Sequence, residues 1–490
     1  MMGIVLIGIV GLLLLLALTL YIIDISQRKN TIRHNYPLIG RFRSGFEHFG
    51  AFFRQYFFAM DREEMPFNRA QREWVYKAAK NVDTTLAFGS TRDLSPVGSI
   101  FFVNCPFPAL EQDAENIQSI VIGDGCKYPF EAKSLFNISG MSYGALSKVA
   151  VLALSKGAAK AGCWMNTGEG GLSPYHLQGG ADLIFQIGTA KYGVRDSDGN
   201  LCDKKLRDVA GHEQVRMFEI KLSQGAKPGK GGLLPGAKVS EEIAHIRGIE
   251  VGQDSISPNR HVDIDSPSDI LDMVERVRRV TGKPVGIKLV LGGCNVLDHL
   301  FEEIQKRGLD SAPDFITLDS ADGGTGAAPQ ALMDYVGMPL SESLPMLVNH
   351  LVGYGLRERI KVVSSGKLVT PANVAWALAM GSDFVLSARG FLFSLGCIQA
   401  LQCNKNTCPT GITTHNLRLQ AGLDPEDKSE RVAHYVENIL HEVGVIAHSC
   451  GVRRLRQLKR HHVRRVDAHG RSVSMASVFP DTVEGKPHGE

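Results

Sequence analysis

The segment Phe315-Ile-Thr-Leu-Asp-Ser-Ala-Asp-Gly-Gly-Thr-Gly326 joins a short apolar run to a glycine-rich loop. Its first part, Phe315–Leu318, has the length and the bounding residues of a buried strand. The loop Asp319–Gly326 that follows contains three glycines, which let a backbone approach a ligand closely. The segment therefore predicts a strand that ends in a ligand-binding loop.

The same order of strand, loop and helix recurs on both sides of this segment, from about residue 113 to residue 450. Alternating strands and helices predict a parallel sheet covered by helices. An open sheet and a closed barrel both fit, but the number of units and the length of the region favour a (β/α)8 TIM barrel. The strand-like runs are Leu135–Ile138, Val285–Val290, Lys361–Val363 and Phe384–Leu386, and the helical runs include Ala145–Ala161, Pro267–Val280 and Asn295–Arg307.

Most of the glycine-rich loops follow a strand-like run, where barrel enzymes hold their active sites. In such barrels the last two strand-end loops often bind phosphate through backbone N–H groups, which Gly366, Gly390 and the glycines of Asp322–Gly326 would allow. Lys221 and Lys288 supply positive charge that could stabilise an anionic flavin ring or a carboxylate substrate. No loop has the spacing of a dinucleotide fingerprint, so we expect no NAD site.

Three cysteines lie close together near the end of this region. Cys397, Cys403 and Cys408 have the spacing Cys-x5-Cys-x4-Cys, followed directly by Pro409. Cysteine thiolate is the usual ligand of iron–sulfur clusters, and three ligands disfavour a closed structural zinc site. On spacing alone, a zinc or redox site and three unrelated thiols stay open.

The N-terminal segment Ile4–Ile23 is almost wholly apolar and is long enough to cross a bilayer as a helix. Basic residues follow it at Arg28, Lys29, Arg33, Arg41 and Arg43, and the positive-inside rule places that side in the cytoplasm. We therefore predict that residues 1–23 are a single-pass anchor in the cell inner membrane, with a cytoplasmic catalytic domain.

Two further regions flank the predicted barrel. Residues 24–112 are expected to form a helical N-terminal region with a helix at Ala70–Lys80, in which the aromatic-rich Arg41–Phe58 stretch packs against protein rather than against a membrane. Residues 451–490 form a basic C-terminal tail, for which a solvated charged helix is favoured over contact with anionic lipid.

Composition limits the possible partners and compartment. The 490-residue chain has a formal net charge of only +3, so it shows no global signal for nucleic-acid binding. Six of its nine cysteines are scattered outside the Cys397–Cys408 loop, which argues against a disulfide framework and fits a reducing compartment.

From about Ser134 to Leu440 the sequence resembles the FMN-binding synthase domain of glutamate synthase. The resemblance is carried by Asn166-Thr-Gly-Glu-Gly-Gly171, Gln224-Gly-Ala-Lys-Pro-Gly229, Asp322-Gly-Gly-Thr-Gly-Ala327 and the cysteine loop. It implies a barrel that holds FMN beside a [3Fe–4S] cluster. In that family, electrons pass through the cluster to FMN, and a hydride reduces 2-iminoglutarate, formed from 2-oxoglutarate and ammonia, to L-glutamate.

The resemblance also implies roles for individual residues. Lys227 and Arg247 would contact the substrate carboxylates, Glu169 would lie near the ammonia entry, and Lys227, Glu169 and Gln224 would form the catalytic set. The cluster would be held by Cys397, Cys403 and Cys408. The cofactor-binding residues would be Ser142, Lys221, Gln224, Lys288, Asp322, Gly323, Gly324, Gly326, Gly366 and Gly390.

Two departures from the family pattern leave the substrate and the reaction partners open. Leu233 stands where the large enzymes have a polar glutamine, and no glutaminase domain is recognised, so ammonia or another amine would come from outside. A ferredoxin or a separate NAD(P)H reductase subunit would supply electrons.

Three other functions compete with the glutamate reaction. They are an N-methylglutamate synthase, another FMN-barrel enzyme such as a 2-hydroxy-acid oxidase or an isomerase, and a membrane electron-relay subunit. The oxidases use a catalytic histidine, and His176, His261 and His415 lie in no motif that supports that role.

Overall fold

The computed structural model describes residues 2–293, 295–483 and 485. Contacts between Cα atoms divide the chain into two compact units, Met1–Ala70 and Gln71–Glu490.

The first unit is helical, with α1 (Met2–Ser26), α2 (Thr31–Asn35), α3 (Ile39–Phe53) and the π-helical turn η1 (Arg54–Phe58). Within it, the buried Asp24 at the end of α1 accepts hydrogen bonds from Leu38 N (3.1 Å) and Arg41 Nη2 (2.7 Å), which ties α1 to the start of α3. Among the described residues, α1 alone has the length and apolar composition needed to cross a membrane, a property that N-terminal signal sequences share.

The second unit is built on a closed barrel of eight parallel strands, which confirms the predicted (β/α)8 fold. The predicted strand runs coincide with barrel strands to within two residues at either end. Going round the barrel, the strands are β4 (Phe136–Ile138), β5 (Met165–Asn166), β6 (Leu183–Ile187), β7 (Val215–Lys221), β10 (Val285–Leu289), β11 (Phe315–Asp319), β12 (Lys361–Ser365) and β13 (Phe384–Ser387).

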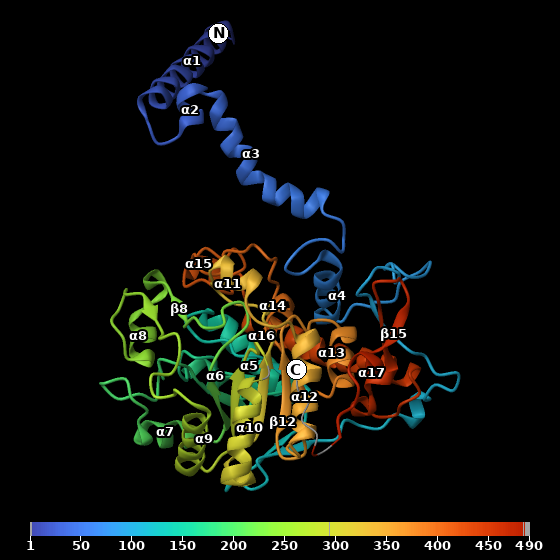
Figure 1. Ribbon diagram of the computed structural model, residues 1–490. Helices are drawn as coiled ribbons and strands as arrows, with labels where there is room; N and C mark the ends of the chain where they lie inside the picture. The colour runs from blue at the N-terminus through green and yellow to red at the C-terminus, as the bar shows by residue number, and fades with distance from the viewer. Residues whose placement is uncertain (1, 294, 484, 486–490) are drawn as a thin grey trace. The chain divides into compact units, whose positions relative to one another are not determined.

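Helices surround the barrel strands (Figure 1). Local signals set their ends: Ser147 caps α5 and Ser266 caps α9, whose last turn stops at Gly282 with φ of 70°. The helices that follow the strands in turn are α5 (Lys148–Ala161), α6 (Pro174–Gln178), α7 (Asp203–Ala210), α9 (Pro267–Thr281), α10 (Asn295–Arg307), α12 (Leu340–Gly353), α13 (Pro371–Ala379), α14 (Arg389–Ser394) and α16 (Pro425–Ser449).

The amino end of the barrel is closed by the hairpin of β2 (Ile120–Ile122) and β3 (Phe130–Ala132). Side chains of the hairpin pack with apolar side chains from the barrel strands, so this end is filled by hydrophobic burial. The polar residues of the barrel lie instead at the carboxyl ends of the strands. The packed cluster comprises Ile122, Phe130, Ala132, Trp164, Ile184, Met217, Phe315, Val363, Phe384 and Leu386.

An insert between β7 and α9 interrupts the regular repeat. It contains β8 (Leu233–Leu234), the short helix η3 (Gly236–Lys238), α8 (Glu241–Arg247) and β9 (Ser255–Ile256), with β8 and β9 paired antiparallel. The sequence predicted the loop at its start but not the folded unit that follows. A shorter helix, α11 (Gln330–Tyr335), occupies the connection after β11.

The C-terminal region folds back on an early segment, so the expected solvated helix is wrong. β14 (Val463–Val466) pairs with β1 (Ile100–Phe102) on one side and with β15 (Ser472–Ser474) on the other. Arg460 is buried and donates hydrogen bonds to Phe479 O (2.9 Å) and Pro345 O (3.2 Å). The remaining elements are α4 (Arg69–Ala79), which confirms the predicted helix there, η2 (Glu111–Asp113), η4 (Leu309–Ser311), α15 (Leu417–Gln420), η5 (Leu455–Gln457), η6 (Arg460–His462) and α17 (Met475–Val478).

Candidate functional site

A cavity of about 1020 Å³, counted with its open mouth, lies where the barrel strands end. Its lining comes from the loops after β4, β5, β7, β11 and β13 and from the β8–β9 insert. Distant segments thus meet at one place, as expected for the carboxyl end of a parallel barrel. The predicted site residues that line it are Ser142, Glu169, Lys221, Gln224, Lys227, Arg247, Gly324 and Gly326.

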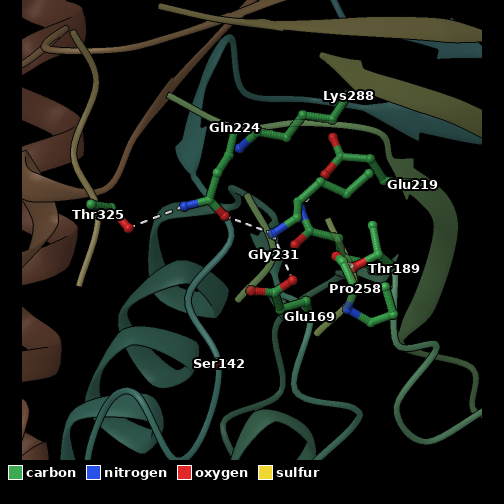
Figure 2. A network of polar contacts seen from close by, with 12 residues as sticks. Ser142, Glu169, Thr189, Glu219, Gln224, Gly231, Pro258, Lys288 and Thr325 are labelled. Carbon is green, nitrogen blue, oxygen red and sulfur yellow. Dashed lines mark hydrogen bonds and ion pairs between the residues drawn. The ribbon is translucent and has the colours of Figure 1, made fainter. Parts of the chain in front are cut away.

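Glu169 and Gln224 are joined through the ammonium group of Lys221. Lys221 Nζ lies 2.7 Å from Glu169 Oε2 and donates to Gln224 Oε1 at 2.6 Å, and Gln224 Nε2 donates to Thr325 Oγ1 at 3.1 Å (Figure 2). Burial opposes the charge on Glu169, but Lys221, with Lys227 and Arg247 behind it, outweighs burial and lowers the pKa of Glu169. The Glu169 carboxylate is therefore ionised at neutral pH.

The absence of a side chain at Gly232 leaves room for the Glu169 carboxylate. A Cβ atom on Gly232 would lie 2.2 Å from Glu169 Oε1, so any larger residue in the insert would displace the carboxylate. Gly232 lies three residues after the motif Gln224–Gly229 that carries the family resemblance.

Arg247 and Lys227 bring two more cations to the cavity from the insert. The buried Arg247 guanidinium donates to Ser255 Oγ (3.2 Å) and Ser142 Oγ (3.4 Å) and lies over the Tyr192 ring. Its Nε has no partner among the described residues, and burial lowers the pKa of Arg247. Burial also lowers the pKa of Lys227, against the charge of Glu169. Two cations held out of bulk water could hold an anionic ligand.

Lys288 lies deeper, in a polar layer inside the barrel that sequence reasoning missed. Its Nζ is 3.4 Å from Asp319 Oδ2, and Asp319 with Glu219 outweighs burial to raise the pKa of Lys288. Glu219 accepts hydrogen bonds from Asn166 (2.8 Å), Gln186 (2.7 Å) and Thr317 (2.6 Å). The sequence feature that could have revealed this layer is Glu219, an acidic residue inside the largely apolar strand β7.

Five predicted cofactor residues lie outside the cavity lining, Lys288 among them, and packing explains two of the glycines. A Cβ on Gly366 would lie 2.3 Å from Ser320 Cβ, and one on Gly390 would lie 2.1 Å from Tyr435 Oη. The Asp322 side chain pairs with Lys367 at 2.9 Å, and Gly323 packs beside Ser320. Phosphate binding by their backbone N–H groups stays a prediction.

The cysteine loop runs along one side of the cavity, which Cys403 lines. The three thiols are close enough to interact electrostatically. Burial raises the pKa of Cys397, negative charge on Cys403 and Cys408 raises it further, and the guanidinium of Arg389 lowers it in part. Burial raises the pKa of Cys408 as well, but hydrogen bonds from Thr410 and Thr413 outweigh it and lower the value. Within the described part of the chain, no group of three or more Cys, His, Asp or Glu is arranged to hold a metal ion.

Two cations beside the cysteine loop were not among the predicted site residues. Arg389 Nη1 lies 3.6 Å from Cys403 Sγ, and the same guanidinium donates to Thr325 O. Lys238 Nζ donates to Ala145 O (2.8 Å) and Cys403 O (3.2 Å). Both line the cavity, so they connect its wall to the loop. Arg389 lies between the predicted strand Phe384–Leu386 and the predicted cofactor residue Gly390, and that position was the signal for it.

A closed parallel barrel with a cationic cavity at the carboxyl ends of its strands defines the class of barrel enzymes. Residues 104–453 match the family described as "Conserved region in glutamate synthase". The chain belongs to the glutamate synthase family and is an oxidoreductase of that class.

Individual relatives agree with this assignment. The chain is 42% identical to the glutamate synthase large subunit-like protein YerD of Bacillus subtilis, over 93% of this chain and 94% of the relative. It is 33% identical to an archaeal-type glutamate synthase [NADPH] of Thermotoga, over 70% of this chain and 64% of the relative. The archaeal glutamate synthase [NADPH] of Methanocaldococcus jannaschii is 35% identical, over 66% and 60% respectively.

Solved structures similar to this fold include mandelate oxidase and a flavocytochrome b2 mutant. Mandelate oxidase has a TM-score of 0.44 and 17% identity, and the match covers 80% of this chain and 98% of that one. The flavocytochrome b2 mutant has a TM-score of 0.46 and 14% identity, with 80% of this chain and 78% of that one covered.

Proposed function

We propose that the protein makes L-glutamate by reductive amination of 2-oxoglutarate, through 2-iminoglutarate, with ammonia supplied from outside the chain. The observation that carries this proposal is the grouping of Glu169, Lys221, Gln224, Lys227 and Arg247 around one cavity. Family membership supports the same reaction class.

Lys227 and Arg247 bind the two carboxylates of the keto acid. On the described residues, Lys227 Nζ has no hydrogen-bond or ion-pair partner, and Arg247 Nε is also unpartnered, so both have donors left for a ligand. Ser255, itself hydrogen-bonded to Tyr192 at 2.9 Å, orients the guanidinium before substrate arrives. Charge-assisted hydrogen bonds of this kind are among the strongest a protein makes.

Glu169 binds the amine substrate. Its ionised carboxylate attracts an ammonium ion and accepts a hydrogen bond from it at Oε1, because Lys221 is hydrogen-bonded to Oε2. The β8–β9 insert contributes lining residues around this group and limits the access of water to the imine.

The residues at the cavity fit FMN. Ser142, Gln224 and Lys221 would hold the flavin ring, and the backbones of Gly324 and Gly326 would approach the cofactor. The buried Lys288, outside the cavity lining, would contribute positive charge. Apolar side chains such as Met141 and Leu392 line the cavity beside these few polar groups, which is the lining typical of a cofactor pocket. FMN, when bound, supplies hydride transfer.

Cys397, Cys403 and Cys408 would hold the [3Fe–4S] cluster. In support, the three thiols belong to one loop, interact electrostatically, and lie beside the cations Arg389 and Lys238. The cluster would supply one-electron transfer, with electrons delivered by a ferredoxin or by a separate NAD(P)H reductase subunit. The apolar helix α1 would anchor the enzyme in the inner membrane with the barrel in the cytoplasm.

Leu233 favours a second candidate, an amine-transferring synthase of the N-methylglutamate type. Leu233 lines the cavity and its side chain is 44% exposed, so an alkyl group on the amine could cover it. Burying that apolar surface would favour methylamine over ammonia.

The test is anaerobic purification with visible and EPR spectra, followed by photoreduction and addition of 2-oxoglutarate with either ammonium or methylamine. We expect flavin and iron signals, and flavin reoxidation with formation of L-glutamate. Reoxidation with methylamine alone selects the second candidate, and reoxidation with neither amine rejects both. Cys403→Ala should remove the iron signal while FMN stays bound, whereas Cys202→Ala, outside the loop, should change neither.

A further inference from the structure

One face of α3 carries a continuous row of large apolar side chains. Its members follow one another at intervals of three and four residues, which places them on a single stripe of the helix. Their exposed fractions run from 43% to 72%, although the sequence favoured packing against protein. The α3 stripe consists of Ile39, Phe42, Phe46, Phe49 and Phe53.

The α3 stripe is continuous with the surface of α1. Phe42, Phe46 and Phe49 line a groove whose other wall is formed by Leu13, Leu16 and Leu20 of α1. Every side chain named here is apolar, and no residue in the most apolar 18-residue window of α1 is buried. An apolar groove that opens on a helix of membrane-spanning length is matched by lipid acyl chains rather than by water.

Charge around the stripe fits a lipid surface as well. Arg43 and Glu47 form an exposed ion pair (3.0 Å) away from the centre of the stripe. His48 falls off the stripe on the helical period, two residues after Phe46, although its ring meets the edge of the Phe49 ring (centroids 5.5 Å apart). Basic residues outnumber acidic ones between the end of α1 and the end of η1, with Arg28, Lys29, Arg33, Arg41, Arg43 and Arg54 against Asp24 and Glu47. Basic residues beside a spanning helix attract anionic headgroups.

We propose that α3 lies in the membrane interface, with the α3 stripe against the acyl chains and its polar face toward the headgroups. Interfacial helices of this kind combine an aromatic apolar face with a charged one. The aromatic turn η1 extends the contact, since Phe57 and Phe58 are also exposed. The inference rests on the proposed insertion of α1, and it gives the enzyme a second membrane element.

The test uses the full chain in vesicles of mixed phosphatidylcholine and phosphatidylglycerol, with and without brominated acyl chains. Phe46→Trp reports on the stripe, the matched His48→Trp reports on the polar face, and Leu14→Trp reports on α1. The unsubstituted chain gives the baseline of the native tryptophans Trp74, Trp164 and Trp376. Bromine quenches only a tryptophan that lies among the acyl chains.

We expect the added tryptophan of Phe46→Trp to be quenched at least about twofold more than that of His48→Trp, since only the stripe faces the chains. If Leu14→Trp is quenched and Phe46→Trp is not, the interfacial position of α3 is overturned and the α1 anchor stands. The α3 stripe would then be covered by a second copy of the protein or by another part of the chain. Absence of quenching at both positions overturns the anchor and the inference together.

Discussion

At the scale of single residues, Lys221 fixes the positions of Glu169 and Gln224 and favours the ionised form of Glu169. It holds Glu169 by an ion pair and Gln224 by a hydrogen bond, so one ammonium group fixes two predicted catalytic side chains. Because the charge of Lys221 is the main force that opposes burial of Glu169, the ionisation of that carboxylate depends on it.

Lys221→Met should lower kcat for glutamate formation by roughly 100-fold, because a preorganised cation at a reacting centre contributes on that order. Steady-state kinetics measure this, and Lys230→Met, an exposed lysine in the same loop, should stay within about twofold of the parent enzyme. An unchanged kcat in Lys221→Met would remove Lys221 and Glu169 from the proposed mechanism.

The same variant should change the pH dependence of stability. The depressed pKa of Glu169 contributes stability above the ordinary carboxyl range, and this contribution is lost as pH falls through the depressed value. Lys221→Met should therefore unfold at lower urea than the parent at pH 7, with the gap narrowing in acid.

At the scale of elements, the barrel places the site and short motifs hold its walls. The helix α6 shows this: His176 Nδ1 accepts from Ser173 N (3.3 Å) and pairs with Ser173 Oγ (2.8 Å), while His176 Nε2 lies 3.4 Å from Met141 O. The histidine thus joins the start of α6 to the loop after β4 that carries Ser142. Its role is structural, in agreement with the absence of a catalytic histidine motif.

His176 should make the barrel sensitive to acid. Burial lowers the pKa of His176 to about 4. The unfolded chain, with an ordinary value of about 6.5, takes up a proton first, so stability falls as pH drops from about 6.5 toward 4, by up to about 3 kcal/mol. Urea unfolding midpoints between pH 7 and 4.5 should show a shallower decline for His176→Gln than for the parent. His469→Gln, at an exposed histidine, should follow the parent, and a parallel decline in both variants would contradict the assignment.

At the scale of the whole molecule, the chain is one helical unit and one barrel unit, with the boundary at Ala70. The barrel unit contains every predicted site residue, and its own N- and C-terminal segments are closed together by β1 and β14. These features predict that the barrel unit is stable once it is separated from the first unit.

Trypsin treatment of the vesicle-bound chain should cut in the non-helical stretch 59–68, at Arg62, and release a barrel fragment into the supernatant. Mass spectrometry of the supernatant measures the cut site, and Arg62→Gln should slow the release. Rapid degradation of the released fragment would show that the barrel unit depends on Met1–Ala70.

The sequence by itself determined the repeat of strands and helices, the strand-end loops and the spacing of Cys397, Cys403 and Cys408. These features are local, because hydrophobic periodicity and turn residues act over a few neighbours. Only the tertiary structure joined Glu169 to Lys221 and Lys288 to Asp319, folded the insert that carries Arg247, and paired β14 with β1. Those contacts depend on closing the barrel, which brings together residues far apart in the chain, and no local pattern specifies which of them will meet.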